Sequence, residues 1–192
     1  MSPRYEPKSS KERKQQAGHQ EIHGETIAKF EFFERGWNPY SRYLDIDKVD
    51  LILRKRTGRN IKYVEVQVKF GRLYEHGTRW QEKLFDATSF RFFKLDEFAR
   101  CNNELYIAYV LSRPGGYKGD IFIFPIREFE DLLGKAIHCN TEQGRKAKLH
   151  ISRERNGNRW FVWRKSRFDS INDQTSVEVS QYWQNFQQIR ST

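Results

Sequence analysis

The sequence holds only two cysteines, Cys101 and Cys139, and neither lies in a Cys-x-x-Cys motif. Two isolated thiols exclude the disulfide framework of small secreted domains and favour a reduced, cytoplasmic setting. The chain also lacks an apolar run of transmembrane length and an N-terminal signal-peptide core, so we expect no membrane attachment. It lacks a Walker A loop and a Gly-x-Ser-x-Gly elbow as well, which argues against P-loop and serine-hydrolase chemistry.

Acidic side chains are scarce relative to basic ones, with 25 Asp and Glu against 35 Lys and Arg and a net charge of +10. This balance favours a polyanionic partner, chiefly DNA. Aromatic residues nevertheless make up 15% of the chain, enough for a packed core beneath a charged surface. We therefore expect a flexible basic tail over residues 1–18 and a single folded domain over residues 19–192.

Hydrophobic periodicity predicts a helix from about His19 to Arg35, ended by Gly36. Alternation and turn signals predict the other elements: a hairpin of 49–55 with 61–70, strands at 105–111 and 121–126, a helix at 127–137, a hairpin of 148–152 with 160–164, and a C-terminal helix at about 176–190. Residues 72–100 show no clear elements. Their phenylalanines are assigned to the core: Phe85, Phe90, Phe92, Phe93 and Phe98.

The segment Val64–Lys69 is the most informative part of the chain, because three valines alternate with Glu65, Gln67 and Lys69. Alternation puts the three polar residues on one face of a strand. Asp50 lies inside the preceding apolar strand. An acid on one strand and a Gln-x-Lys on the next can hold a divalent cation beside a phosphodiester and place a lysine near the attacking water.

Two alternatives stay open for this motif. Asp45 and Asp47 are rival acids, although both precede the apolar strand that contains Asp50. Short motifs of this kind also recur freely, so the three polar residues of the second strand can instead form the solvent face of an amphipathic strand.

The arrangement resembles the PD-(D/E)xK nuclease superfamily, which includes restriction endonucleases, homing endonucleases and Holliday-junction resolvases. The resemblance covers roughly Gly24 to Ile126 in the order of elements. It implies an α/β fold in which a mixed central sheet is flanked by helices, as in restriction endonucleases. It also implies hydrolysis of DNA phosphodiester bonds that depends on Mg²⁺ or Mn²⁺, and it makes a homo-oligomer an expectation.

The resemblance carries over to particular residues. Asp50 takes the place of the first acid of the motif, and Gln67-Val68-Lys69 takes the place of (D/E)-x-Lys. Glu25 resembles the acid that such proteins carry on their first helix, and Glu21 lies one helical turn away as an alternative. Asp50, Gln67 and Glu25 would then hold the metal, and Lys69 would position the nucleophilic water. Gln67 departs from the usual acid, as in a Gln-x-Lys variant of the motif, and Glu65 is a residue that can compensate.

A second feature is a run of cations with interleaved aromatic residues near the C-terminal third. Trp160, Phe161 and Trp163 lie within it, and the aromatic rings could stack on bases while the cations contact phosphates. The alternative is that alternate residues form core and the rest a solvated face. The cations assigned to DNA binding are Arg145, Lys146, Lys148, Arg153, Arg155, Arg159, Arg164 and Lys165.

The sequence thus favours a metal-dependent DNA endonuclease. A DNA-binding module that kept such a fold but lost catalysis is the alternative, and Gln67 is the residue that suggests it. A basic protein-interaction domain without nucleic acid is a third interpretation.

Overall fold

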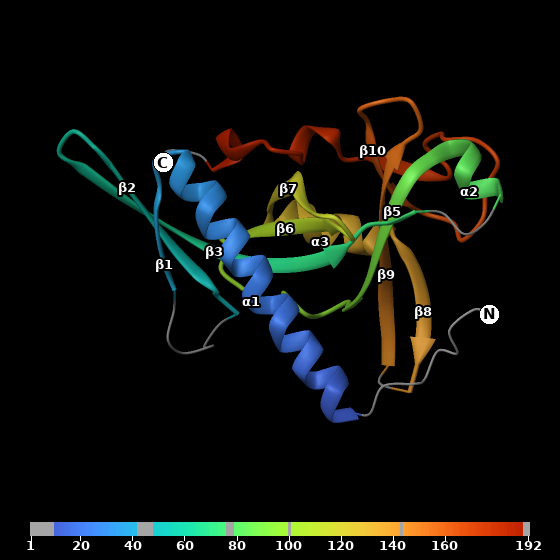
Figure 1. Cartoon of the computed structure of the whole chain (residues 1–192), viewed down its shortest axis with the longest axis horizontal. Helices are drawn as coiled ribbons and strands as arrows, with labels where there is room; N and C mark the ends of the chain where they lie inside the picture. Colours follow the sequence, from blue (N-terminus) through green and yellow to red (C-terminus); the bar gives the residue numbers. More distant parts are fainter. Residues whose placement is uncertain (1–9, 42–47, 76–78, 100, 143, 190–192) are drawn as a thin grey trace.

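In the computed structural model, residues 10–41, 48–75, 79–99, 101–142 and 144–189 are described, and they form two sheets with few helices (Figure 1). The first sheet has the order β1 (Asn38–Ser41), β2 (Leu51–Thr57), β3 (Asn60–Arg72), β6 (Tyr106–Arg113) and β7 (Gly116–Pro125). The second has the order β11 (Ser176–Glu178), β10 (Trp160–Trp163), β9 (Gly144–Glu154), β5 (Phe85–Lys94) and β4 (Tyr74–Glu75), with β8 (Ile137–Thr141) also paired to β9.

The helices are α1 (Ser10–Glu34), α2 (Arg79–Leu84) and α3 (Ile126–Lys135), followed by two single 3₁₀ turns, η1 (Ser180–Tyr182) and η2 (Phe186–Gln188). Helix α1 begins nine residues before the expected His19, so residues 10–18, expected as part of a flexible tail, are helical; residues 1–9 lie outside the described residues. The helix ends as expected at Gly36, whose φ of 77° is a left-handed conformation that glycine adopts without strain.

Strand β3 joins the two halves of the first sheet because it exchanges partners at Val66. Up to Val66 it pairs antiparallel with β2, and from Val66 to Arg72 it pairs parallel with β6. The parallel pair needs a crossover connection. That crossover contains helix α2 and the strands β4 and β5. Both strands belong to the second sheet, so the connection between two strands of the first sheet supplies part of the second.

Two apolar clusters cover the two faces of the first sheet. One face packs against α1, where Ala28 and Phe32 meet the even-numbered side chains of β3, Val64 to Phe70. The other face carries Ile107 and Tyr109 of β6 and packs against α3 and the inner face of the second sheet. In Figure 1, β3 and β6 run across the view while β5, β8 and β9 run down it, so the two sheets cross rather than continue one another.

The expected fold is correct only in its coarse form. The chain is a mixed α/β protein that consists mostly of strands, and it has two sheets where one central sheet flanked by helices was expected. The hairpins 51–72 and 144–163, the strands β6 and β7, and the helix α3 are confirmed. No helix among the described residues is long and apolar enough to cross a membrane.

The C-terminal helix expected at 176–190 is wrong: the segment forms β11 and the two 3₁₀ turns. Thr175 does not act as the cap of a helix there. Its hydroxyl donates to backbone carbonyls of the preceding loop and accepts from the Asn172 amide, so its bonds close the turn that leads into β11. Gln184 has a positive φ of 51°, which interrupts helical geometry, and Trp183 forms a bridge to Phe122 of β7 instead.

The outer face of the second sheet holds a stack of aromatic rings around His150. The imidazole of His150 lies parallel to the buried Trp163 ring, with centroids 4.4 Å apart. Burial, aided by the charge of Lys148, lowers the pKa of His150 from 6.5 to about 4. The stack therefore contains a neutral imidazole at neutral pH, and its Nδ1 has no hydrogen-bond partner in the described part of the chain.

This stack predicts a pH-dependent stability. The unfolded chain binds a proton at His150 near pH 6.5, but the folded protein does so only near a pKa of about 4. The neutral His150 ring therefore contributes about 2–3 kcal/mol to the free energy of unfolding above about pH 6.5. This contribution is lost as the pH falls toward 4. His150→Phe keeps the ring stack but cannot titrate. Urea unfolding at pH 7 and pH 4.5 should show a smaller acid loss for His150→Phe than for wild type; equal losses would contradict the assignment.

Candidate active site

Asp50 lies against β3 at the point where β2 and β3 begin to diverge. The last paired residues are Leu51 and Val66, and Asp50 directly precedes this paired segment. The backbone N–H of Asp50 donates to the Val66 carbonyl at 3.0 Å. This bond joins residue 50 to residue 66 and not to residue 67, so the regular register ends at Leu51. Asp50 therefore lies beside the part of β3 that contains Gln67, and the pairing of their side chains at one metal stays a prediction.

The carboxylate of Asp50 also completes the backbone bonding of β3. Its Oδ2 accepts a hydrogen bond from the Val68 amide at 2.6 Å. Burial raises the pKa of Asp50 to about 6, against the lowering effects of the Val68 bond and Lys69, and the charges of Glu25 and Glu21 raise it further. An acid held in this way carries its negative charge at a cost at neutral pH, and a bound cation would remove that cost.

Gln67 is buried with only 6% of its surface exposed, and its Oε1 has no hydrogen-bond partner among the described residues. A buried amide oxygen without a partner typically costs about 1–3 kcal/mol. Asp50 bonds to the backbone of Val66 and Val68, the residues on either side of Gln67. Carboxylate and amide oxygens are both hard ligands of the type that Mg²⁺ and Mn²⁺ prefer. The orphaned oxygen thus fits a metal that completes its shell with water.

Lys69 lies two residues further along the same face of β3, mostly buried, and its Nζ contacts Glu97 Oε1 at 3.2 Å. Lys48 donates to the backbone carbonyl of Glu97, and both ammonium groups lie near the ring of Phe98. Glu97 is a residue that sequence reasoning missed. It follows β5 in the segment that showed no clear pattern, so no periodicity marked it as a neighbour of Lys69.

Helix α1 brings its acids close to Asp50 because Gly24 lets the helix approach β3. A Cβ at Gly24 would lie 2.9 Å from the Cβ of Phe70, closer than side chains pack. Glu25 forms a 4.0 Å ion pair with Lys29, and burial raises its pKa. The charges of Glu25 and Glu21 both raise the pKa of Asp50, so both candidate acids lie near it and the choice between them stays open. Asp45 and Asp47, the rival acids, lie outside the described residues.

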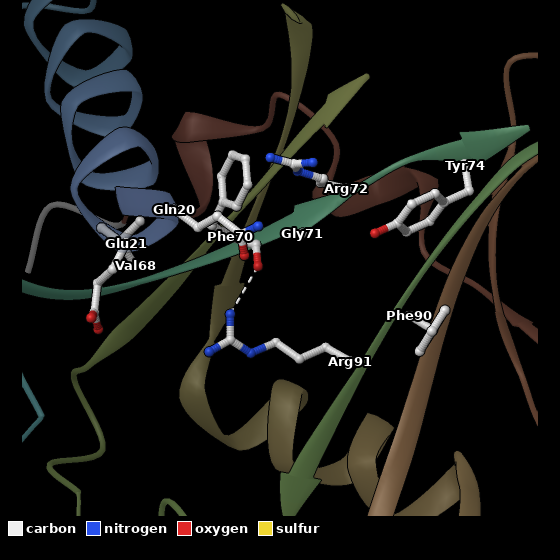
Figure 2. Close-up of a pocket in the computed structure, with 9 residues that line it drawn as sticks. All are labelled: Gln20, Glu21, Val68, Phe70, Gly71, Arg72, Tyr74, Phe90 and Arg91. Carbon is white, nitrogen blue, oxygen red and sulfur yellow. Dashed lines mark hydrogen bonds between the residues drawn. The ribbon is translucent and has the colours of Figure 1, made fainter. Parts of the chain in front are cut away.

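A cleft of about 350 Å³ runs along the β3 edge that β2 leaves open beyond Val66. Figure 2 shows Val68, Phe70 and Arg72 of β3 along one side, Gln20 and Glu21 of α1 at one end, and Tyr74, Phe90 and Arg91 at the other. The Arg91 guanidinium donates to the Phe70 carbonyl at 2.8 Å. Asp50 and Arg91 therefore bond backbone groups of two β3 residues, Val68 and Phe70, one with negative and one with positive charge.

The basic residues assigned to DNA binding do not form one continuous stripe. Within β9, Lys146 and Lys148 lie on the outer face, and alternate residues point to the inner core. Several arginines bond to their own surroundings: Arg145 with His138, Arg153 with the 156–158 turn, Arg155 with Glu82, Arg159 with Glu154, and Arg164 with Asp173. Lys165 is exposed. Their role in DNA binding stays a prediction.

The aromatic residues of this run are core residues, so of the two interpretations left open, the stacking of Trp160, Phe161 and Trp163 on bases is wrong. All three side chains are buried, and they pack between the sheets or under α2. The opposite correction holds for two residues of β5. Phe90 and Phe92 were assigned to the core, but both are about half exposed.

A second basic surface is the tip of the β2–β3 hairpin, which sequence reasoning did not single out. The five cations between Leu53 and Tyr63 have no acidic residue among them: Arg54, Lys55, Arg56, Arg59 and Lys62. The hairpin projects from the body of the molecule at the end away from the second sheet (Figure 1). Beside it lies a broad hollow that also receives Arg35.

Comparisons of the chain with protein-family models, curated proteins and solved structures found no match. The resemblance to PD-(D/E)xK nucleases therefore stays a prediction. No three His, Cys, Asp or Glu side chains of the described residues gather into a metal-binding group. The assignment of Asp50, Gln67 and Glu25 as metal ligands stays a prediction.

The raised pKa of Asp50 predicts that its charge destabilises the metal-free fold. Its folded pKa of about 6 lies above the ordinary 3.8, so its contribution to stability falls as the pH rises through this window. Asp50→Asn keeps an acceptor for the Val68 amide and should stabilise the metal-free protein at pH 8 by about 1–2 kcal/mol, allowing for partial exposure.

The measurement is urea unfolding in EDTA and again in Mg²⁺. Mg²⁺ should stabilise wild type and leave Asp50→Asn unchanged, because binding to the folded state alone raises stability. Asp86→Asn, at an exposed position of β5, is the control and should alter neither result. A loss of stability in Asp50→Asn would show that Asp50 is a structural acid.

Proposed function

We propose that this protein is a metal-dependent DNA endonuclease that hydrolyses phosphodiester bonds. The observation that carries the proposal is that Asp50 bonds to the β3 backbone on both sides of Gln67, at Val66 and Val68. The buried Oε1 of Gln67 has no partner among the described residues, and Lys69 lies two residues further along the same strand face. An amphipathic strand with a solvated face would leave Gln67 and Lys69 exposed. Both are instead largely buried, which favours a functional over a solvent-facing role.

Asp50, the Gln67 amide oxygen and Glu25 or Glu21 would hold Mg²⁺ or Mn²⁺ at this point. Such a cation polarises the scissile phosphate and lowers the pKa of bound water. Lys69 carries a positive charge on the same face and would orient the attacking water and stabilise the charge that develops on the phosphate. Glu97 would act as a positioning residue, since its carboxylate fixes the Lys69 ammonium.

Charge supports DNA as the substrate. The net charge of +10 and the acid-free tip of the β2–β3 hairpin provide an electrostatic surface for a phosphate backbone. The hairpin is continuous with the strands that carry Asp50 and Gln67, so a duplex held by its cations would lie within one strand length of the proposed site.

The second candidate is a DNA-binding module of the same architecture without catalysis. Gln67 favours it, because an amide in place of an acid removes one charge from the site. The lack of a three-acid group among the described residues points the same way. A homo-oligomer stays a prediction; exposed Ile22, Phe30 and Phe33 on α1 supply apolar surface that a second copy would bury.

Cleavage assays distinguish the two candidates. Supercoiled, branched and linear DNA should be cut by wild type with Mg²⁺ or Mn²⁺ and not in EDTA. Lys69→Ala should keep metal and DNA binding but slow cleavage by about 100-fold or more, because its role lies in the transition state. Gln67→Glu should raise metal affinity. If wild type binds these substrates and cuts none, the non-catalytic module is correct.

Duplex binding should depend steeply on salt, because each neutralised phosphate releases a counterion. Replacing Arg56, Arg59 and Lys62 of the hairpin by glutamine should weaken binding and reduce the slope of log K against log salt by about 0.9 for each phosphate that is no longer neutralised. The control is glutamine at Arg127 and Lys135 of α3, which are paired with acids on their own helix, and the two sets are compared per cation removed. Equal effects per cation would contradict a DNA role for the hairpin.

A further inference from the structure

Three aromatic side chains stand in a row on the outer face of the second sheet. Tyr74 of β4 and Phe90 and Phe92 of β5 are 51%, 48% and 46% exposed. The ring centroids of Tyr74 and Phe90 are 6.3 Å apart, and those of Phe90 and Phe92 are 6.4 Å apart. The Tyr74 and Phe90 rings are tilted by 34°, and the Phe90 and Phe92 rings meet at 83°, so the half-exposed row combines ring faces with ring edges. We call this row the aromatic platform.

The central ring of the platform, Phe90, packs on rings beneath it. The Phe90 ring contacts the His150 ring at 5.7 Å, and His150 in turn stacks on the buried Trp163. Phe92 and Phe90 also lie along one strand at alternate positions, so the sheet fixes their spacing. A surface that is already ordered binds a flat ligand without the entropic cost of ordering side chains.

Cations accompany the rings. The Lys148 ammonium lies 5.0 Å from the Phe90 centroid and 5.8 Å from the Phe92 centroid. Arg72 and Arg91 line the cleft that starts at Tyr74 and Phe90 (Figure 2). Flat apolar faces beside positive charge match the two parts of a nucleotide, because a base stacks on a ring and a phosphate pairs with a cation.

The cleft connects the platform to the proposed active site. It runs from Tyr74 and Phe90 along the open edge of β3 to Val68, whose amide is bonded to the Asp50 carboxylate. A strand that follows this edge passes Arg91 before it reaches the acids. Paired bases in a duplex hide their faces in the stack, so the platform suits a segment whose bases are unpaired.

We propose that the aromatic platform binds the unpaired bases of single-stranded nucleic acid and that the β3 cleft leads its phosphates toward Asp50. Binding by the platform stands independently of catalysis; only the delivery of a phosphate to Asp50 rests on the proposed nuclease function. An apolar protein partner would need the rings but not Lys148, Arg72 and Arg91, which favours the nucleic acid.

The test is fluorescence anisotropy in EDTA with three probes of equal length: oligothymidylate, the same strand with abasic sites, and a duplex. Wild type should bind oligothymidylate more tightly than the abasic strand. Phe90→Ala with Phe92→Ala should lower affinity for oligothymidylate by about tenfold or more and leave the abasic strand and the duplex unchanged. Phe90→Leu with Phe92→Leu keeps apolar bulk without a π face and should show the same loss.

Tyr40→Ala on β1 is the control, since Tyr40 is 47% exposed on the other sheet, and it should bind all three probes as wild type does. Thermal unfolding checks that each variant is folded. Equal wild-type affinity for oligothymidylate and the abasic strand would overturn the proposal. An undiminished affinity for oligothymidylate in both phenylalanine variants would overturn it as well, and would indicate that the rings bind a protein partner instead. Base-dependent binding without cleavage in Mg²⁺ would reject the nuclease and keep the platform; cleavage of duplex without base-dependent binding would do the reverse.

Discussion

The change of partner at Val66 is the constraint on which the rest of the structure depends. Strand β3 leaves β2 at this residue and continues beside β6, so six further residues run with one edge open. Unpaired backbone groups need partners, and the chain supplies two charged side chains: the Asp50 carboxylate for the Val68 amide and the Arg91 guanidinium for the Phe70 carbonyl. The cleft, the acids and the platform all lie along this edge. A strand paired on both sides throughout would leave no room for them.

The second consequence is electrostatic. The Asp50 carboxylate accepts a backbone hydrogen bond, yet burial and the nearby charges of α1 make its ionised form unfavourable. The amide oxygen of Gln67 has no partner among the described residues. Gly24 brings α1 and its acids near. The burial of ionised Asp50 and of the Gln67 oxygen lowers the stability of the fold, as residues kept for function often do. The ion pair with Glu97 holds the Lys69 ammonium on the same strand face as Gln67.

Hydrophobic alternation and turn residues predicted the elements that depend only on residues close together in the sequence. The β2–β3 hairpin, β6, β7 and α3 follow from alternation and turn residues, and Asp50 comes to lie beside β3 because the hairpin turn sets the register up to Leu51 and Val66. The crossover could not be predicted, because its strand β5 pairs with β9, far away in the sequence. For the same reason Phe90 was assigned to the wrong environment and that of Trp163 stayed open: burial there is decided by how the two sheets cross, not by the strand's own sequence. Glu97 was missed because it reaches Lys69 only through tertiary packing.

The central claim is that Asp50 and Gln67 together hold a divalent cation. A crystal grown with Mn²⁺ tests it most directly, because anomalous scattering locates the ion without reference to activity. We expect a single anomalous peak between the two strands, about 2.1–2.2 Å from a carboxylate oxygen of Asp50 and from Oε1 of Gln67, close to the lengths that hard divalent cations adopt with oxygen ligands. A structure in which the peak is absent, or lies elsewhere while Gln67 keeps its buried amide without a ligand, would contradict the account.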